Sequence, residues 1–415
     1  MRSGINLCKK GTRCQVCIGC GRCFGEEDGL KGISFVVENK LLGEKRTDSC
    51  AYVAGRRLVT VDIGTTTVAM QLHAPDGSVE DYFAQVNPQT KYGADVLSRI
   101  EAAGDSAIAE DLQTLIHQVL KQGFDRFKAV LKDEETLWAV IAANTTMVYL
   151  LMGYSARELG QAPFIASYLG HVLTQIEGVE CLICPGLSAF VGGDILAGMI
   201  ACNMWDADET TLLIDLGTNG EMVLGNRERM IACSTAAGPA FEGGVNRGIW
   251  GADMIRLLAK LLQESIMDET GLLADSYFDT GVRVGDVCVT QQSIRAVQLA
   301  KGAIRAGIEI LAQEYGIDLA GIDRVVLAGG FGYYLNPEAA AQIGLLPGEL
   351  VGKTIAGGNT ALAGVLKLGC DYLCRGEACF EEYDRERVHV LNLAQRPEFE
   401  ELYLGYLNFG EACDD

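Results

Sequence analysis

The sequence has few basic residues and no long apolar run. Its 415 residues include 34 Lys and Arg against 55 Asp and Glu, which gives a formal net charge of −21. Because proteins contact nucleic-acid phosphates with Lys and Arg, this balance argues against a general nucleic-acid binder. No apolar stretch reaches the roughly 18 residues of a membrane span, and residues 1–14 contain no apolar signal core. We therefore expect a cytoplasmic protein that binds neither nucleic acid nor membrane.

Glycine and cysteine, in contrast, are abundant. The chain holds 50 Gly, about twice the average usage, so tight turns and close backbone approaches are frequent. It also holds 15 Cys. Because cytosolic thiols stay reduced, we expect these cysteines to be metal ligands, redox groups or small buried side chains rather than disulfides. The length favours two or three domains.

A strand followed by a glycine and three threonines organises the chain. LVTVDIGTTTVAMQL covers Leu58–Leu72: an apolar run ends at Asp62, and Gly64 and Thr65–Thr67 follow. Glycine lets the backbone approach a ligand, and N–H groups and hydroxyls supply donors to phosphate oxygens. The carboxylate of Asp62 suits Mg²⁺ bound through water. The pattern predicts a phosphate-binding hairpin, although by itself it also fits a buried strand before an ordinary glycine turn.

The same order of residues occurs a second time. LLIDLGTNGEMVL covers Leu212–Leu224 and aligns with the first stretch at Asp215, Gly217 and Thr218. A repeated strand with an Asp-x-Gly-Thr turn, far apart in one chain, indicates two related halves. Two hairpins that close on one nucleotide explain the repeat better than two unrelated strand–turn pairs.

A third stretch also ends a strand in glycines. RVVLAGGFGYYLNP covers Arg324–Pro337, and its apolar strand runs into Gly329 and Gly330. A glycine pair lets the backbone pass close to a flat ligand, here adenosine. A tight strand-to-helix turn has the same pattern.

These three stretches resemble the phosphate-1, phosphate-2 and adenosine motifs of the sugar kinase, Hsp70 and actin superfamily. Five further stretches are similar to the ATPase part of the reductive activators of corrinoid proteins: NPQTKYGADVLSRI (87–100), ANTTMVYLLMG (143–153), GQAPF (160–164), STAAGPAFEGG (234–244) and RPEFEELYLGYLNF (396–409). The resemblance implies an α/β fold with two RNase H-like halves, as in the actin-like ATPases, around a nucleotide cleft.

The resemblance also implies site residues. Asp194 opens a helix where the superfamily often has an acid that orients the attacking water; capping that helix is the alternative. Asn144 has the same two interpretations, cleft residue or cap. Lys301 and Arg305 share one face of the helix expected at 293–315, and reach either the nucleotide or solvent. The catalytic candidates are Asp62, Asp194 and Asp215, and those for ATP binding are Gly64, Thr65, Thr66, Thr67, Gly217, Thr218, Asn219, Gly238, Glu242, Gly329, Gly330 and Phe331.

The first 55 residues form a cysteine-rich segment with a C-x2-C-x2-C-x2-C run. Thiolates at this spacing on a glycine-rich loop converge on one soft metal centre, as in the bacterial ferredoxin run. We predict a [4Fe–4S] cluster; a tetrahedral Zn²⁺ site is one alternative. A [2Fe–2S] cluster is another, because the spacing from Cys8 is similar to the ferredoxin domain of the corrinoid activators. The candidate ligands are Cys14, Cys17, Cys20 and either Cys23 or Cys50.

Four regions follow from these motifs: the cysteine-rich segment (1–55), a first ATPase half (56–205), a second half (206–368) and a C-terminal segment (369–415) that packs back on the ATPase. Periodicity also predicts a helix at 105–132 and a closing amphipathic helix at 391–409, and an apolar run predicts a strand at 137–142.

The resemblance implies an enzyme that hydrolyses ATP with Mg²⁺ and passes a low-potential electron from the iron–sulfur cluster to a corrinoid protein of a methyltransferase system. The enzyme would receive this electron from a low-potential donor. The resemblance leaves open whether the protein forms a homodimer. The alternatives are a small-molecule kinase on the same fold and a zinc-containing, ATP-driven regulatory or chaperone-like switch.

Overall fold

Two β-sheets form the framework of the protein. The computed structural model describes residues 52–53, 55–217, 219–236, 251–284 and 287–410. In these residues the first sheet has the order β4-β3-β2-β5-β7-β6, with β1 paired to β2, and the second has the order β14-β13-β8-β9-β10-β15. The strands of the first sheet are β1 (Tyr52–Val53), β2 (Arg56–Ile63), β3 (Thr67–His73), β4 (Val79–Val86), β5 (Thr136–Ala143), β6 (Val172–Ile176) and β7 (Val179–Ile183). Those of the second are β8 (Thr211–Leu216), β9 (Gly220–Gly225), β10 (Met230–Thr235), β13 (Arg324–Ala328), β14 (Thr354–Gly358) and β15 (Val388–Leu391).

Each sheet is built around the same unit. In the first, β2 pairs antiparallel with β3 and parallel with β5, so Asp62 lies between these two strands. In the second, β8 pairs antiparallel with β9 and parallel with β13, and Asp215 lies between them. The shared hairpin and parallel neighbour confirm the two related α/β halves that the repeated motif predicted.

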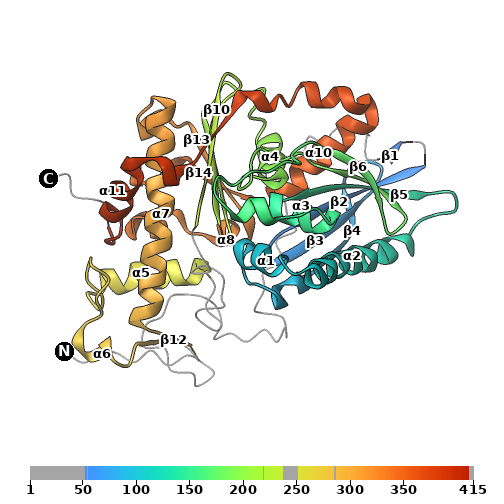
Figure 1. The fold of residues 1–415 in the computed structure, drawn as a ribbon. Coiled ribbons are helices and arrows are strands. Elements are labelled where there is room, and N and C mark those ends of the chain that lie inside the picture. Colours follow the sequence, from blue (N-terminus) through green and yellow to red (C-terminus); the bar gives the residue numbers. More distant parts are fainter. Residues whose placement is uncertain (1–51, 54, 218, 237–250, 285–286, 411–415) are drawn as a thin grey trace.

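The helices lie in layers around these sheets (Figure 1). Two helices, α4 (Gly193–Ala201) and α10 (Thr360–Arg375), lie between the sheets and share one apolar core with their inner faces. The outer face of the first sheet is covered by α2 (Ser106–Lys128) and α3 (Thr145–Met152). The outer face of the second is covered by α5 (Gly251–Gln263), α7 (Gln291–Tyr315) and α9 (Pro337–Gln342). The other elements are α1 (Val96–Ala102), α6 (Asp275–Phe278), α8 (Gly329–Tyr334), α11 (Pro397–Gly405), β11 (Val282–Val284), β12 (Val287–Val289) and the 3₁₀ turns η2 (Pro88–Lys91), η3 (Arg157–Gly160), η5 (Leu319–Gly321), η6 (Gly348–Lys353), η7 (Gly376–Glu381), η8 (Arg385–Arg387) and η9 (Leu393–Gln395).

The alternation of side chains along β2 and β8 decides where the two aspartates point. Val59 of β2 packs in the outer core with α2, whereas Leu58 packs in the inner core with α4 and α10. Because successive side chains of a strand point to opposite faces, Asp62 lies on the side of Leu58. Leu213 of β8 belongs to the same inner core, so Asp215 faces it as well. Both aspartates therefore point toward the layer between the sheets.

The two helices of the inner layer cross with their backbones in close contact. A Cβ atom on Gly364 of α10 would lie 1.7 Å from the carbonyl oxygen of Ala197 in α4. A Cβ atom on Gly198 of α4 would lie 3.0 Å from the hydroxyl oxygen of Thr360. Small residues at the crossing let the helices, and the sheets on either side of them, approach closely.

The end of the chain differs from the predicted closing helix over 391–409. Residues Val388–Leu391 form β15 and pair in parallel with β10, and α11 begins only at Pro397. Proline fixes the first helical position, and the short β-branched run before it finds a partner strand far away in the sequence. The helix at 105–132 and the strand at 137–142 are confirmed as α2 and β5, and the helix at 293–315 as α7.

Both interpretations of Lys301 and Arg305, nucleotide contact and solvent, are wrong. Lys301 is fully buried, and its Nζ donates to the carbonyl of Tyr406 at 2.7 Å and to that of Asn408. Arg305 pairs with Glu309 at 2.9 Å and stacks on the ring of Tyr406. The contacts with Lys301 and Arg305 thus hold the residues after α11 against α7.

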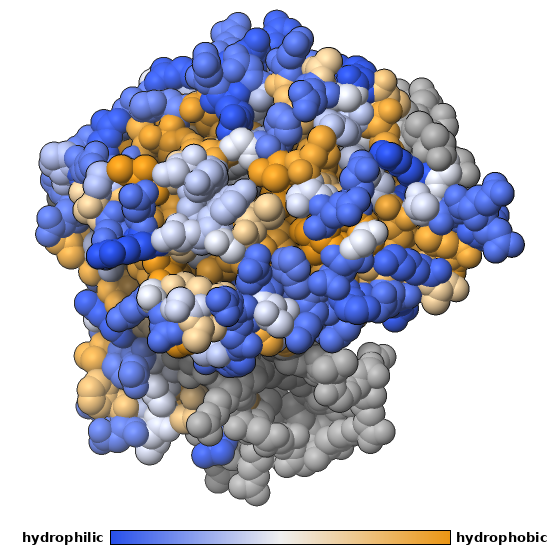
Figure 2. Space-filling view, turned by 45° about the vertical axis from the view of Figure 1, so that its right-hand side comes forward, coloured by the Kyte–Doolittle hydropathy of each residue, from blue (hydrophilic) through white to orange (hydrophobic). Residues whose placement is uncertain are grey.

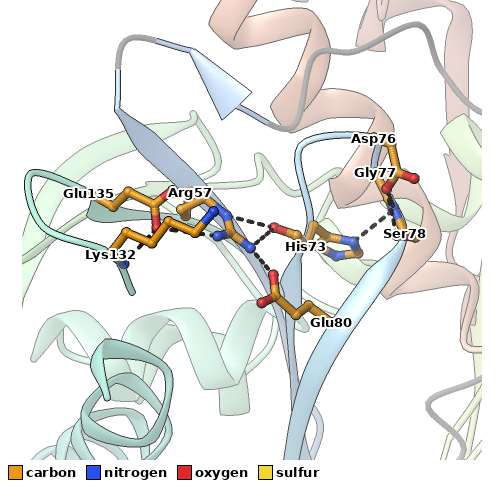
Figure 3. A network of polar contacts seen from close by, with 8 residues as sticks. All are labelled: Arg57, His73, Asp76, Gly77, Ser78, Glu80, Lys132 and Glu135. Carbon is orange, nitrogen blue, oxygen red and sulfur yellow. Dashed lines mark hydrogen bonds and ion pairs between the residues drawn. The ribbon is translucent and has the colours of Figure 1, made fainter. Parts of the chain in front are cut away.

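A buried polar network secures the start of β2 (Figure 3). The guanidinium of Arg57 donates to the carbonyl of His73 at 2.9 and 3.1 Å, and forms ion pairs with Glu80 and Glu135. The Nδ1 of His73 donates to the Gly77 carbonyl at 3.1 Å. Its Nε2 therefore accepts from the Thr60 hydroxyl, at 3.0 Å. Burial lowers the pKa of His73 to about 4, so the imidazole is neutral in the folded protein.

The surface in view in Figure 2 mixes apolar patches with more extensive polar areas. The apolar side chains on the surface of the described residues include Tyr82 on β4 and Ile165 and Tyr168 after η3. Among the helices that the structure describes, none combines the length and apolarity needed to cross a bilayer.

We predict that Gly364→Ala destabilises the fold by about 1–3 kcal/mol, because the added methyl group must push α4 and α10 apart. The measurement is the midpoint of thermal unfolding. Gly405→Ala on α11 is the matched control, since a Cβ atom at that position would have no other residue within 4 Å. Equal midpoints for the two variants would contradict the close crossing.

A second prediction concerns acid. The folded-state pKa of His73, about 4, lies below its unfolded value near 6.5, so protonation favours unfolding. The contribution of the neutral imidazole, at most about 3 kcal/mol, is complete above pH 6.5 and is lost as the pH falls toward 4. His73→Gln should therefore lower stability less at pH 4.5 than at pH 7, roughly by this amount. The exposed His389→Gln is the control, and parallel stability curves for wild type and His73→Gln would refute the assignment.

Candidate functional site

The first hairpin holds its turn with backbone and side-chain bonds. The amide of Gly64 donates to the carbonyl of Thr67 at 2.9 Å, and a Cβ atom on Gly64 would lie 2.9 Å from that oxygen. Asn144 donates from Nδ2 to the hydroxyl oxygen of Thr65 at 3.1 Å, and its Oδ1 accepts from Met147 N at 2.9 Å. The capping interpretation of Asn144 is therefore confirmed, and its position at a nucleotide cleft stays a prediction that the bond to Thr65 supports.

Two residues behind this hairpin were not singled out from the sequence. Arg99 of α1 is fully buried, and its Nη2 donates to the Thr65 carbonyl at 2.5 Å. The side chain of Asn87 donates from Nδ2 to the Gly64 carbonyl at 2.9 Å. Its backbone N–H donates to the Thr66 carbonyl at 2.8 Å. Both residues lie in the stretch 87–100. The resemblance of this stretch to the corrinoid activators was the sequence feature that could have identified them. Both fix the shape of the turn by binding its carbonyl groups.

Asp62 at the end of β2 has one strong polar partner. Asn359, the residue before α10, donates from Nδ2 to Asp62 Oδ2 at 2.7 Å. Burial raises the pKa of Asp62 to about 6, and the bond from Asn359 acts in the opposite direction. A carboxylate oriented by a fixed amide donor can order a hydrated cation, as predicted for this residue.

The second hairpin presents two acids to the same space. Asp215 of β8 lies opposite Glu221 of β9, and the amide of Gly217 closes the turn on the carbonyl of Asn219 at 3.0 Å. Burial, and then the charge of Asp62, raise the pKa of Asp215 to about 7. Glu221 is buried, accepts a 3.4 Å bond from Asn219 Nδ2, and was not singled out from the sequence. Its position directly across a predicted hairpin from Asp215 was the available signal.

Asp194 completes a group of four acids from both halves. It lies in the first turn of α4, whose N-cap residue is Gly192, and its Oδ1 accepts from Ile195 N at 2.9 Å. Burial, then the charges of Asp215 and Asp62, raise the pKa of Asp194 to about 8. Burial and the charges of Asp194 and Asp215 also raise the pKa of Glu221 well above its usual range. The four carboxyls therefore share one electrostatic environment and resist being ionised together.

The third stretch reaches this cluster through its first glycine. Gly329 begins α8 directly after β13 and has a φ of +78°. A Cβ atom there would lie 2.6 Å from Asp215 Oδ1 and 3.1 Å from the Leu216 carbonyl. The interpretation of this stretch as a tight strand-to-helix turn is thus confirmed. Only glycine fits position 329 of this turn, because a side chain there would collide with the second hairpin. Gly330 and the backbone of Phe331 follow in the same helix.

The structure therefore brings the three predicted catalytic aspartates, both hairpins and Gly329 close together in the layer between the two sheets. Some of the predicted site residues lie outside the described residues: Thr218, Gly238, Glu242, Cys14, Cys17, Cys20, Cys23 and Cys50. In the part that is described, no three His, Cys, Asp or Glu side chains are arranged to hold a metal ion directly. The donor set at the cleft consists of carboxylates and one amide, which suits a hydrated Mg²⁺.

Comparisons with known proteins match nearly all of this chain. A family model described as the RACo middle region matches residues 58–207. A second, described as the C-terminal domain of RACo, the ASKHA domain, matches residues 209–247 and 245–412. The solved structure of a reductive activator for a corrinoid, iron–sulfur protein has 29% sequence identity and a TM-score of 0.75, covering 86% of this chain and 67% of that one.

Two curated relatives are also similar. The corrinoid activation enzyme RamQ of Eubacterium limosum is 28% identical over 432 residues, which cover 85% of this chain and 70% of the relative. A reductase of a Co(II) methylated amine-specific corrinoid protein from Methanosarcina barkeri is 26% identical over 238 residues, which cover 45% of this chain and 44% of the relative.

The two sheets with their related hairpins define an α/β protein of the sugar kinase, Hsp70 and actin class, as the ASKHA designation of the second matched domain states. More narrowly, the chain belongs to the RACo family, the reductive activators of corrinoid proteins.

We predict that Asp194→Asn slows ATP turnover at least tenfold while nucleotide affinity changes little, because the amide cannot accept a proton from water. The same variant should be more stable than wild type at pH 8. The raised pKa of Asp194 means that its ionisation disfavours folding increasingly as the pH rises from about 4 to about 8. Asn removes this penalty.

A capping role alone predicts a different result for Asp194→Asn, with turnover kept and stability little changed, because Asn caps a helix about as well as Asp. Asp105→Asn is the matched control, because Asp105 caps α2 through the amides of Ala107 and Ile108 at an exposed position. Calorimetric unfolding and steady-state turnover of the two variants decide between the roles.

Proposed function

We propose that this protein is an enzyme that uses ATP to activate a corrinoid protein by reduction, passing it one electron from an iron–sulfur cluster. The observation that carries the proposal is the meeting of Asp62 and Asp215, from two related hairpins, in the cleft of a RACo-family fold. The names of the relatives, a corrinoid activation enzyme and a corrinoid-protein reductase, support the reaction class.

The cleft suits Mg²⁺–ATP on three grounds. The turns after Asp62 and Asp215 offer backbone N–H groups and the hydroxyl of Thr65 to phosphate oxygens. Burial raises the pKa of Asp62 and of Asp215, and a bound cation would favour the ionised form of both carboxyls. Gly329 lets the backbone beside Asp215 come close to a ligand. In this assignment Asp62 orders hydrated Mg²⁺, and Asp194 accepts a proton from the attacking water.

Bound Mg²⁺–ATP would supply the free energy of phosphate hydrolysis, and the chain must convert it into movement. The acids of the cleft come from both halves, so a cation that neutralises them draws the halves together. The inner helices α4 and α10 lie between the sheets and touch both, and are therefore the elements about which closure takes place. We assign closure of the cleft as the event that ATP controls.

Electron transfer is assigned to the cysteine-rich segment because most of the described thiols are buried. Burial raises the pKa of Cys181 and Cys202 to about 12 and that of Cys379 to about 11, so these groups stay protonated. Metal-binding cysteines must be thiolates. A cluster held by Cys14, Cys17, Cys20 and either Cys23 or Cys50, most simply [4Fe–4S], would supply one-electron chemistry. Its electron would come from a low-potential donor, and the partner would be a corrinoid protein of a methyltransferase system.

We predict that the anaerobically purified protein contains iron and sulfide. It should reduce a corrinoid protein only when ATP, Mg²⁺ and a low-potential electron donor are all present, as followed by the corrinoid absorbance. Cys17→Ser and Cys20→Ser should lose iron and corrinoid reduction but keep ATP binding, because their thiolates are cluster ligands. Cys374→Ser, at an exposed position on α10, is the control that should keep both.

Two other outcomes would replace the proposal. Stoichiometric zinc without iron after anaerobic reconstitution would favour an ATP-driven regulatory switch, since zinc carries no electron. Phosphorylation of a small molecule at a rate that accounts for all ATP turnover would favour a kinase.

A further inference from the structure

The helices that start at the cleft carry related sequences at their beginnings. Gly192 is the N-cap residue of α4, and Gly193 and Asp194 begin that helix. Gly357 and Gly358 end β14 of the second sheet, and Asn359 is the N-cap residue of α10. Both helix starts thus have two glycines followed by a polar residue. This third residue is the acid Asp194 at α4 and the amide Asn359 at α10.

Each helix start faces a hairpin aspartate. The charge that most affects Asp194 is that of Asp215, in the opposite sheet. Asn359 follows β14 of the second sheet and bonds Asp62 of the first at 2.7 Å. Each helix start therefore faces the hairpin of the opposite half. Asp194 of α4 faces another acid, Asp215, whereas Asn359 before α10 faces Asp62 with an amide.

The amide group of Asn359 is held in one orientation. Its Oδ1 accepts from Leu362 N at 2.8 Å and so caps α10, which leaves Nδ2 to face Asp62. Gly358 before it has a φ of +74°, a conformation that side chains other than glycine rarely adopt. The backbone turn and the cap together aim one N–H donor at one carboxylate oxygen.

We propose that Asn359 is a positioning residue that fixes the Asp62 carboxylate for Mg²⁺–nucleotide and ties it to the start of α10. The inference rests on the proposed ATP function of the cleft. Because one residue caps α10 and holds Asp62, a movement of α10 relative to the first sheet shifts the carboxylate directly. Asn359 thereby links closure of the halves to the geometry at the first hairpin.

The test compares two substitutions that keep the helix cap. Asn359→Ser retains a capping oxygen but loses the donor to Asp62, and Asn359→Asp retains size and cap but puts a carboxylate against Asp62. Turnover should fall about 10- to 100-fold in Asn359→Ser, the effect of losing a charge-assisted hydrogen bond, and further in Asn359→Asp. Half-saturating Mg²⁺ should rise in the same order. Asn392→Asp, which alters the exposed cap of η9, should change neither quantity.

A swap of the two side chains tests the contact without relying on activity. Asn359→Asp should lower the thermal midpoint of the nucleotide-free protein, and adding Asp62→Asn should restore it by re-forming an amide–carboxylate bond in the reverse direction. Turnover should stay low in the swap, because the carboxylate is on the wrong element.

The results separate the two levels of the inference. Wild-type turnover in both Asn359 variants, or no recovery of the midpoint in the swap, would overturn the role of Asn359. Absence of ATP binding by the wild type would overturn the proposed function, while the swap would still report on the Asn359–Asp62 contact.

Discussion

The structure depends on one electrostatic constraint, the crowding of like charges in the layer between its sheets. Asp62, Asp194, Asp215 and Glu221 come from both halves, and their pKa values are all raised by burial. For Asp194, Asp215 and Glu221, neighbouring acids add to the effect of burial. Carboxyls this crowded favour separation of the halves unless protons or a cation neutralise them. A cation bound among these acids would therefore stabilise the arrangement in which they lie close together, as linkage requires.

If a bound cation changes this charge as proposed, the packing around the four acids would transmit the change to large elements. The strand β2 is close-packed, with Leu58, Val59, Val61 and Ile63 all fully buried. Close-packed cores respond to force by shifting as units rather than by deforming locally. The glycine crossing of α4 and α10 permits close contact without interlocking side chains, so these helices are suited to slide or rotate together as the halves move.

The sequence allowed the hairpins to be predicted because their information is local. Asp, Gly and Thr follow an apolar strand within a few residues, and the pattern occurs twice. Contacts between residues that are distant in the sequence leave no local pattern of this kind. Asn359 and Asp62 are 297 positions apart, and their contact is seen only in the folded structure. Lys301 was misplaced for the same reason, since a basic residue on a helix is usually exposed, but here carbonyls from beyond α11 bury it. The cysteine-rich segment, predicted from spacing alone, stays a prediction.

The position at which that segment joins the ATPase limits how ATP can act on it. It enters through β1, which pairs with β2 at Arg56 and Arg57, whereas Asp62 lies near the other end of β2. Asp62 lies six positions along the extended strand from Arg56, a distance of about 20 Å. The network of Arg57, His73 and their partners fastens the entry end to the sheet, so that end moves with the first half as one body. If ATP drives the electron as proposed, its effect must therefore appear as a changed position of the whole first half relative to the second, rather than as a local change at the segment's attachment.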